Sequence, residues 1–167
     1  MGNPGGEARW GGPVGADLQP ARRGKHYPRL KTVTQNEGDP VSKEVADSFV
    51  EALWKLEEDR DVEALVEVHT EDCDVGNVAV PRTFSGHDGL REFWTSYRDT
   101  FGNMKSEFRN VFADDAGHAA LEWTTTGDAN GKDVSYDGVS LLEIESGKVS
   151  RFRAYFDPRT VTEQVVD

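Results

Sequence analysis

The stretch "GKVSRFRAYFDP", residues 147–158, raises the first question of chemistry in this chain. Side chains alternate across a strand, so a strand here places Phe152, Ala154 and Phe156 together on one face. That face offers no proton donor or acceptor. It is therefore expected to line a core, a binding pocket or an active site that lacks its acid.

Tyr136 is the side chain best suited to chemistry. In "DVSYDGVSL", alternation turns Tyr136 inward and Asp137 outward. A phenol in an apolar cavity can donate a hydrogen bond to a carbonyl or to a developing oxyanion. A tyrosine that only fills space at a cavity mouth would give the same pattern, so both interpretations stay open.

The histidine and cysteine patterns do not indicate a metal site or a nucleophile. The four histidines are scattered, and none forms a ligand spacing with another ligand type. No glycine-rich phosphate loop and no Ser or Cys nucleophile motif occurs. We expect neither a metal nor a cofactor. His69 ends a helical stretch and is expected at the surface.

Helical periodicity predicts the elements of the first half of the domain. Apolar residues at helical spacing predict helices over 41–56, 58–69 and 85–101, with a short strand at 73–80. Ser42 is the expected N-cap of the first helix. Ser85 and Asp88 match a capping box at the start of the third.

After Gly102 the pattern changes to period two. It predicts strands at 104–113, 118–127, 133–144 and 148–156, joined as consecutive antiparallel hairpins. Helices followed by a meander of strands indicate α+β architecture. We expect about three helices on one face of a curved antiparallel sheet.

Residues 1–40 differ in composition from the rest of the chain. They are rich in Gly and Pro and show neither helical nor strand periodicity. A disordered or loosely attached tail is therefore expected, followed by one domain over 41–167. A true start at Val33 or Val41 is an alternative. The tail is basic, whereas the whole chain has a net charge of −12.

The charge, hydropathy and cysteine usage exclude several classes of function. An acidic domain does not suit binding to phosphate backbones, and the short basic stretch "ARRGKHYPRLK" is expected to be solvated rather than a nucleic-acid arm. No apolar run approaches the roughly 20 residues of a membrane helix, and the first 20 residues do not resemble a secretory signal. Cys73 is the single cysteine, so a cytoplasmic location is the default.

The segments "SGHDGLREFW" and "GKVSRFRAYFD", with the order of elements around them, resemble the SnoaL-like group of the nuclear transport factor two-like superfamily. The resemblance covers about residues 43–160. It implies a conical fold with a ligand cavity between the concave sheet and the helices, commonly in a homodimer. Ketosteroid isomerase, limonene epoxide hydrolase and polyketide cyclases share this fold, and each relies on cavity carboxylates.

The resemblance also implies that this chain lacks those carboxylates. Asn77 stands where ketosteroid isomerase has its general-base Asp and where the epoxide hydrolase has an Asn. Ala154 stands where the hydrolase and the cyclases have a catalytic Asp. The epoxide hydrolase also has an inward-facing Arg and Asp two residues apart. The corresponding positions of this chain lie among Leu121, Trp123 and Thr125, none of which is a carboxylate. An amide can orient a water but is no base near neutral pH.

We therefore expect a pocket for a small apolar molecule, with Tyr136 and Asn77 as its chemical candidates. The alternatives are an enzyme of the cyclase, isomerase or hydrolase type acting through Tyr136 or Asn77, and a cone simply filled by aromatic side chains. The outward strand residues Val139, Leu141, Arg151, Arg153 and Tyr155 suit a dimer interface. The expected pocket residues are Phe49, Leu53, Asn77, Met104, Ser106, Trp123, Thr125, Tyr136, Gly138, Phe152, Ala154 and Phe156.

Overall fold

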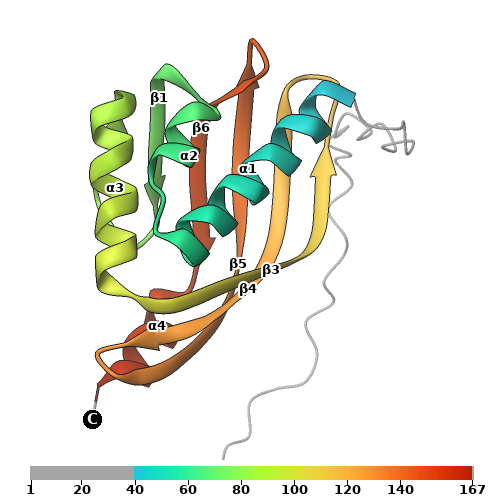
Figure 1. Ribbon diagram of the computed structural model, residues 1–167. Helices are drawn as coiled ribbons and strands as arrows, with labels where there is room; N and C mark the ends of the chain where they lie inside the picture. Colours follow the sequence, from blue (N-terminus) through green and yellow to red (C-terminus); the bar gives the residue numbers. More distant parts are fainter. Residues whose placement is uncertain (1–39, 167) are drawn as a thin grey trace, which may run out of the picture. The chain divides into compact units, whose positions relative to one another are not determined.

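The computed structural model describes residues 40–166 as helices packed on one face of a curved sheet (Figure 1). The predicted tail, residues 1–40, falls almost wholly outside the described residues. The helices are α1 (Pro40–Asp59), α2 (Glu63–Glu67), α3 (Gly86–Thr100) and α4 (Pro158–Val165). The strands are β1 (His69–Asn77), β2 (Phe84–Ser85), β3 (Gly102–Ala113), β4 (His118–Ala129), β5 (Lys132–Glu145) and β6 (Lys148–Phe156).

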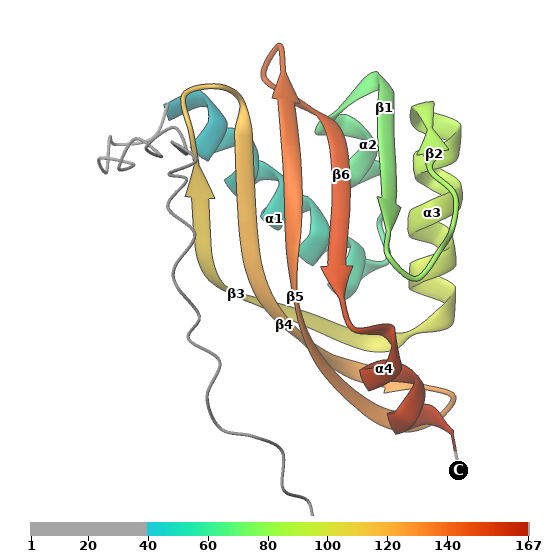
Figure 2. The ribbon, with the colours of Figure 1, turned by 180° about the vertical axis from the view of Figure 1, so that it is seen from behind.

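The sheet has the order β2-β1-β6-β5-β4-β3 and is mixed rather than fully antiparallel (Figure 2). Strands β3 to β6 form the predicted meander. β1, however, runs parallel to β6, with Asn77 beside Ala154. The chain leaves β1 through β2 and α3 and re-enters at the far edge of the sheet, so the last strand returns beside β1 in the same direction.

Helix α1 packs against the strands of the meander, whereas α3 packs against β1 and β2. The apolar stripes of these helices bury Phe49, Leu56 and Leu90 completely. The inward residues of the strands meet them, and Val75, Leu121 and Leu142 are equally buried. The predicted α+β fold with helices on one face of a curved sheet is confirmed.

Two predicted helix caps are wrong. Helix α1 begins at Pro40, because proline is tolerated in a first helical turn, and Ser42 therefore lies buried inside the helix. Ser85 does stand at the N-cap of α3, but its side chain makes no capping bond. Its hydroxyl donates instead to Asp74 in the neighbouring strand β1.

Two short elements were not predicted. β2 pairs with β1 over only two residues. Helix α4 follows Asp157, which accepts a hydrogen bond from the Arg159 N–H at 3.0 Å, and Pro158 occupies its first turn. Gln164 of α4 binds the main chain of Ser135 in β5 through both its amide oxygen and its amide nitrogen. These bonds hold α4 against the end of the sheet.

His69 is buried, so its predicted surface position is wrong. The chain passes from α2 almost directly into β1, which turns the His69 ring toward Phe49 with the ring centroids 6.0 Å apart. Nδ1 donates to the Leu65 carbonyl at 2.7 Å, since a carbonyl oxygen only accepts. Burial lowers the pKa of His69 from 6.5 to about 4. The neutral ring is therefore part of the core.

No helix of residues 40–166 is long and apolar enough to span a membrane. Cys73 is buried and free within that range.

Candidate functional site

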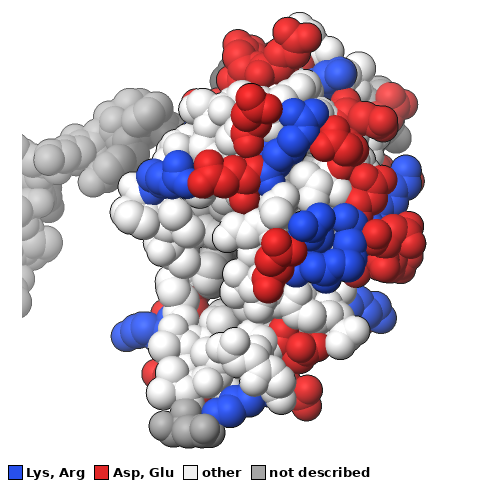
Figure 3. Space-filling view, turned by 60° about the vertical axis from the view of Figure 1, so that its left-hand side comes forward, with Lys and Arg blue, Asp and Glu red and all other residues white. Residues whose placement is uncertain are grey.

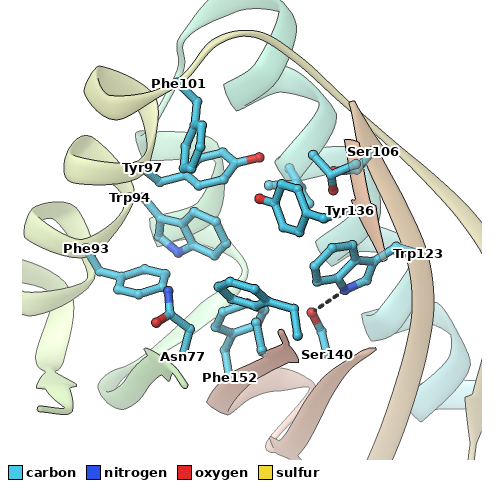
Figure 4. Close-up of a pocket in the computed structure, with 14 residues that line it drawn as sticks. Asn77, Phe93, Trp94, Tyr97, Phe101, Ser106, Trp123, Tyr136, Ser140 and Phe152 are labelled. Carbon is cyan, nitrogen blue, oxygen red and sulfur yellow. Dashed lines mark hydrogen bonds between the residues drawn. The ribbon is translucent and has the colours of Figure 1, made fainter. Parts of the chain in front are cut away.

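A cavity lies between α3, α1 and the concave face of the sheet (Figure 4). We call it the inner chamber, and its volume is about 80 Å³. Aromatic rings from α3 and from strands β4, β5 and β6 form most of its wall. Its lining residues are Leu53, Asn77, Phe93, Trp94, Tyr97, Phe101, Ser106, Trp123, Thr125, Tyr136, Ser140, Phe152, Ala154 and Phe156.

A second space, the outer chamber, adjoins the first and has a volume of about 280 Å³. Both chambers share Asn77, Phe93, Tyr97, Phe101 and Phe156 as lining residues. The outer chamber is otherwise bounded by the turn after β1 and by α4. A molecule too large for the inner chamber can therefore extend outward between α3 and α4.

The wall formed by β4 and β5 is held by one hydrogen bond and by ring contacts. The Trp123 indole N–H donates to the Ser140 hydroxyl at 2.9 Å. The ring of Tyr136 stands edge-on to Trp123 at 5.6 Å between centroids and packs against Phe156 at 5.4 Å. These contacts fix the direction in which the Tyr136 hydroxyl points.

Tyr136 presents its hydroxyl to the inner chamber without a hydrogen-bond partner among residues 40–166. Burial, and then the negative charge of Glu57, raises the pKa of Tyr136 well above its usual value. The phenol therefore stays protonated. It can donate one hydrogen bond to a molecule in the chamber.

Asn77 lies where β1 ends, at the boundary of the two chambers. Its Oδ1 accepts hydrogen bonds from the N–H groups of Ala79 and Val80, at 2.9 and 3.0 Å. This arrangement is an Asx turn, which satisfies the backbone after the strand. The amide oxygen is thus committed to the turn, and only the amide nitrogen remains for a ligand.

A part-buried carboxylate that the sequence pattern did not indicate lies directly behind the lining. Glu57 on α1 accepts hydrogen bonds from the Ser106 N–H at 2.9 Å, the Ser106 hydroxyl at 2.6 Å and the Tyr97 hydroxyl at 3.3 Å. Ser106 in turn shares a 2.8 Å hydrogen bond with the Thr125 hydroxyl. We call the hydroxyls of Tyr97, Ser106 and Thr125 the hydroxyl cluster. Burial raises the pKa of Glu57, although these donors oppose the shift.

Most of the predicted pocket residues reach the inner chamber, and three do not. Phe49 is fully buried behind the wall, stacked on Phe152 at 5.3 Å. Met104 faces outer grooves beside α1. Gly138 lies beneath the Trp123 ring. The others are Leu53, Asn77, Ser106, Trp123, Thr125, Tyr136, Phe152, Ala154 and Phe156.

The aromatic residues of α3 complete the lining but were absent from the predicted pocket. Phe93, Trp94, Tyr97 and Phe101 lie on the apolar stripe of this helix, and periodicity alone identifies that stripe. The sequence pattern that points to Glu57 is weaker. Glu57 follows Leu53 by four positions, so it shares a helix face with a lining residue.

Two further kinds of site were sought among residues 40–166, a metal centre and a basic surface. In the part of the chain that the structure describes, no group of three or more His, Cys, Asp or Glu residues could hold a metal ion. Figure 3 shows basic and acidic side chains intermingled on one face of the molecule. Basic and acidic side chains also pair with one another, as in Arg91–Glu63 and Arg82–Glu92. That face does not present a basic patch of the kind that binds nucleic acid.

The layered α+β fold, with its aromatic chamber, defines a protein of the nuclear transport factor two-like class. A family model, the SnoaL-like domain, matches residues 48–152. Since this match covers more than half of the chain, the protein belongs to the SnoaL-like family. No curated protein sequence matches the chain.

Several solved structures share the fold at low sequence identity. An LEH-like epoxide hydrolase from M. tuberculosis is 19% identical, with a TM-score of 0.58 over 75% of this chain and 89% of that one. A putative SnoaL-like polyketide cyclase from Jannaschia sp. CCS1 is 15% identical, with a TM-score of 0.63 over 76% and 94%. TerC, co-crystallised with polyporic acid, is 19% identical, with a TM-score of 0.64 over 74% and 97%. At these identities the likeness shows the fold alone.

Proposed function

We propose that this protein binds a small apolar molecule, carrying one polar group, in the inner chamber. The observation that carries the proposal is the unpartnered Tyr136 hydroxyl within an otherwise aromatic cavity. Ligand pockets are usually apolar with a few convergent polar groups that orient the ligand. The co-crystal of TerC with polyporic acid is consistent with ligand binding by this fold.

The composition of the lining supports binding over conventional acid–base catalysis. None of the residues lining the inner chamber carries a carboxylate, and Ala154 and Asn77 occupy the places where acids are expected from the family resemblance. General acid and base groups each contribute about 10²- to 10⁴-fold to a rate. We therefore expect no efficient turnover of epoxide or ketosteroid substrates.

An enzyme of the cyclase, isomerase or hydrolase type is the second candidate, and Glu57 favours it. Its carboxylate lies one hydrogen bond behind Tyr97 and Ser106, which both line the chamber. In such an enzyme Tyr136 or Asn77 would position the substrate, while Glu57 would exchange protons through a hydroxyl.

The partner and the location of the protein are further parts of the proposal. The outer face of the sheet exposes Leu141 and Tyr155, at 45% and 43%, which suits the surface of a homodimer. With one buried cysteine, Cys73, among the described residues, the chain requires no oxidising compartment, so we propose a cytoplasmic protein.

A paired assay tests binding against catalysis. Thermal shifts are measured with toluene, naphthalene and cyclohexanone, and turnover is measured with limonene oxide and a Δ5-ketosteroid. The proposal expects stabilisation by the ligands without turnover, and weaker binding of the ketone by Tyr136→Phe, since a neutral hydrogen bond contributes about 0.5–1.5 kcal/mol. Tyr155→Phe, on the outer face, is the matched control. Efficient turnover by the unmodified protein would favour the enzyme instead.

A further inference from the structure

The direction of the hydrogen bonds around Glu57 determines what the chamber offers to a ligand. Two side-chain hydroxyls and one main-chain N–H point at this carboxylate, which acts as an acceptor toward all three. The protons of Tyr97 and Ser106 are therefore directed away from the chamber, toward α1.

The same reasoning assigns the next hydrogen bond in the cluster. The Ser106 hydroxyl donates its hydrogen bond to Glu57. Thr125 is therefore the donor in the 2.8 Å hydrogen bond between Thr125 and Ser106. Each member of the hydroxyl cluster thus has its proton engaged within the protein. What the cluster can still present to a ligand is oxygen lone pairs.

Tyr97 is the member of the cluster that lines both chambers. Its hydroxyl oxygen and that of Tyr136 point toward one another in Figure 4. No hydrogen bond joins them among the described residues, yet each lines the inner chamber. One phenol, Tyr97, retains lone pairs on the chamber side, whereas the other, Tyr136, retains its proton.

We propose that the Tyr97–Tyr136 pair is a binding site for a neutral hydroxyl group on an apolar ring, such as a phenol or a cyclic alcohol. The ligand hydroxyl accepts from Tyr136 and donates to Tyr97, so both halves of the pair are used. A carbonyl only accepts, so it uses Tyr136 alone. A carboxylate is disfavoured, because the Glu57 carboxylate lies directly behind Tyr97.

This inference rests on the proposed binding function and narrows its ligand class. A hydroxyl gains one more hydrogen bond than a carbonyl of similar size and polarity. Since one neutral hydrogen bond contributes about 0.5–1.5 kcal/mol, we expect phenol to bind roughly three- to tenfold tighter than benzaldehyde. Anisole accepts but cannot donate, and it should resemble benzaldehyde.

The experiment measures the dissociation constants of phenol, anisole, benzaldehyde, benzoate and toluene by ligand-observed NMR with the full chain. Phenol is expected to bind more tightly than anisole and benzaldehyde, with benzoate weakest. Tyr97→Phe and Glu57→Gln should abolish the preference of phenol over benzaldehyde, and Tyr136→Phe should weaken phenol and benzaldehyde while sparing toluene. Tyr155→Phe should change none of these ratios.

The outcomes separate this inference from the proposed function. If toluene binds but phenol shows no advantage over benzaldehyde in the unmodified protein, the hydroxyl site is wrong while the apolar pocket stands. If no ligand of the panel binds, both fail. Phenol and benzaldehyde are compared in the unmodified protein, which requires no variant. The inference can therefore be refuted even if one of the variants does not fold.

Discussion

The indole ring of Trp123 lies directly over the backbone of Gly138 in the neighbouring strand. A Cβ built at position 138 would overlap the far edge of this ring and lie 2.7 Å from the Tyr155 carbonyl oxygen. The absence of a side chain is what lets Trp123 lie flat against β5 and reach the Ser140 hydroxyl. One glycine thus shapes the aromatic wall of the inner chamber.

Gly138→Ala should therefore destabilise the protein. The indole must move to admit the new methyl group, and overpacking of this kind typically costs about 1–3 kcal/mol. The free energy of unfolding, measured by chemical denaturation, should fall by this amount. Ser135→Ala, at an exposed position of the same strand, should stay within about 0.5 kcal/mol of the unmodified protein. Equal stability of the two variants would show that Trp123 does not lie on Gly138.

His69 should make stability depend on pH between its ordinary pKa and its folded one. The folded state lowers the pKa of His69 from 6.5 to about 4, so the unfolded chain binds this proton first as the pH falls. The contribution of the neutral His69 ring to the free energy of unfolding is full above pH 6.5 and is lost as the pH falls toward 4. A shift of this size corresponds to about 3 kcal/mol.

The measurement compares the unmodified protein with His69→Phe in denaturation series from pH 7.5 to pH 4. As the pH falls, the unmodified protein should lose stability relative to His69→Phe. The difference between their free energies of unfolding should change by about 3 kcal/mol over the series. A constant difference across the series would mean that His69 is not held neutral in the core.

The outer face of the sheet should mediate dimerisation. The strand register aligns Phe112, Ala120, Leu141 and Arg153 across this face, and Phe112 is 63% exposed. An apolar surface of this kind, edged by cations, suits an interface. Light scattering should give a dimer at micromolar concentration, and Leu141→Glu should convert it to a monomer. Val166→Glu, at an exposed site beyond α4, should not. A monomeric unmodified protein would refute the interface.

Local sequence patterns predicted the parts of the molecule that depend on periodicity. Alternation along β4, β5 and β6 placed Trp123, Tyr136 and Ala154 inward without reference to any distant residue, and the structure has them there. The stripe of α3 was equally readable. Register and face follow from period two once one side of a sheet is buried.

Features that depend on tertiary contacts were not predictable in this way. The hydrogen bonds of Glu57 join α1 to β3, and the helix pattern, which only places Glu57 on the same face as Leu53, does not show that Ser106 lies opposite it. His69 is buried by Phe49 from a separate helix. The parallel pairing of β1 with β6 likewise depends on where the chain returns after α3.

The central claim is that an apolar ligand occupies the inner chamber, and filling the chamber tests it most directly. Ala154 lines the chamber and is 8% exposed, so Ala154→Phe places a ring inside it, while Ala116→Phe adds the same bulk at an exposed position of the turn between β3 and β4. The measurement is titration calorimetry of toluene at several temperatures. We predict one binding site with a negative heat-capacity change in the unmodified protein and in Ala116→Phe, and no binding in Ala154→Phe. Unchanged binding in a correctly folded Ala154→Phe would place the ligand elsewhere and contradict the claim.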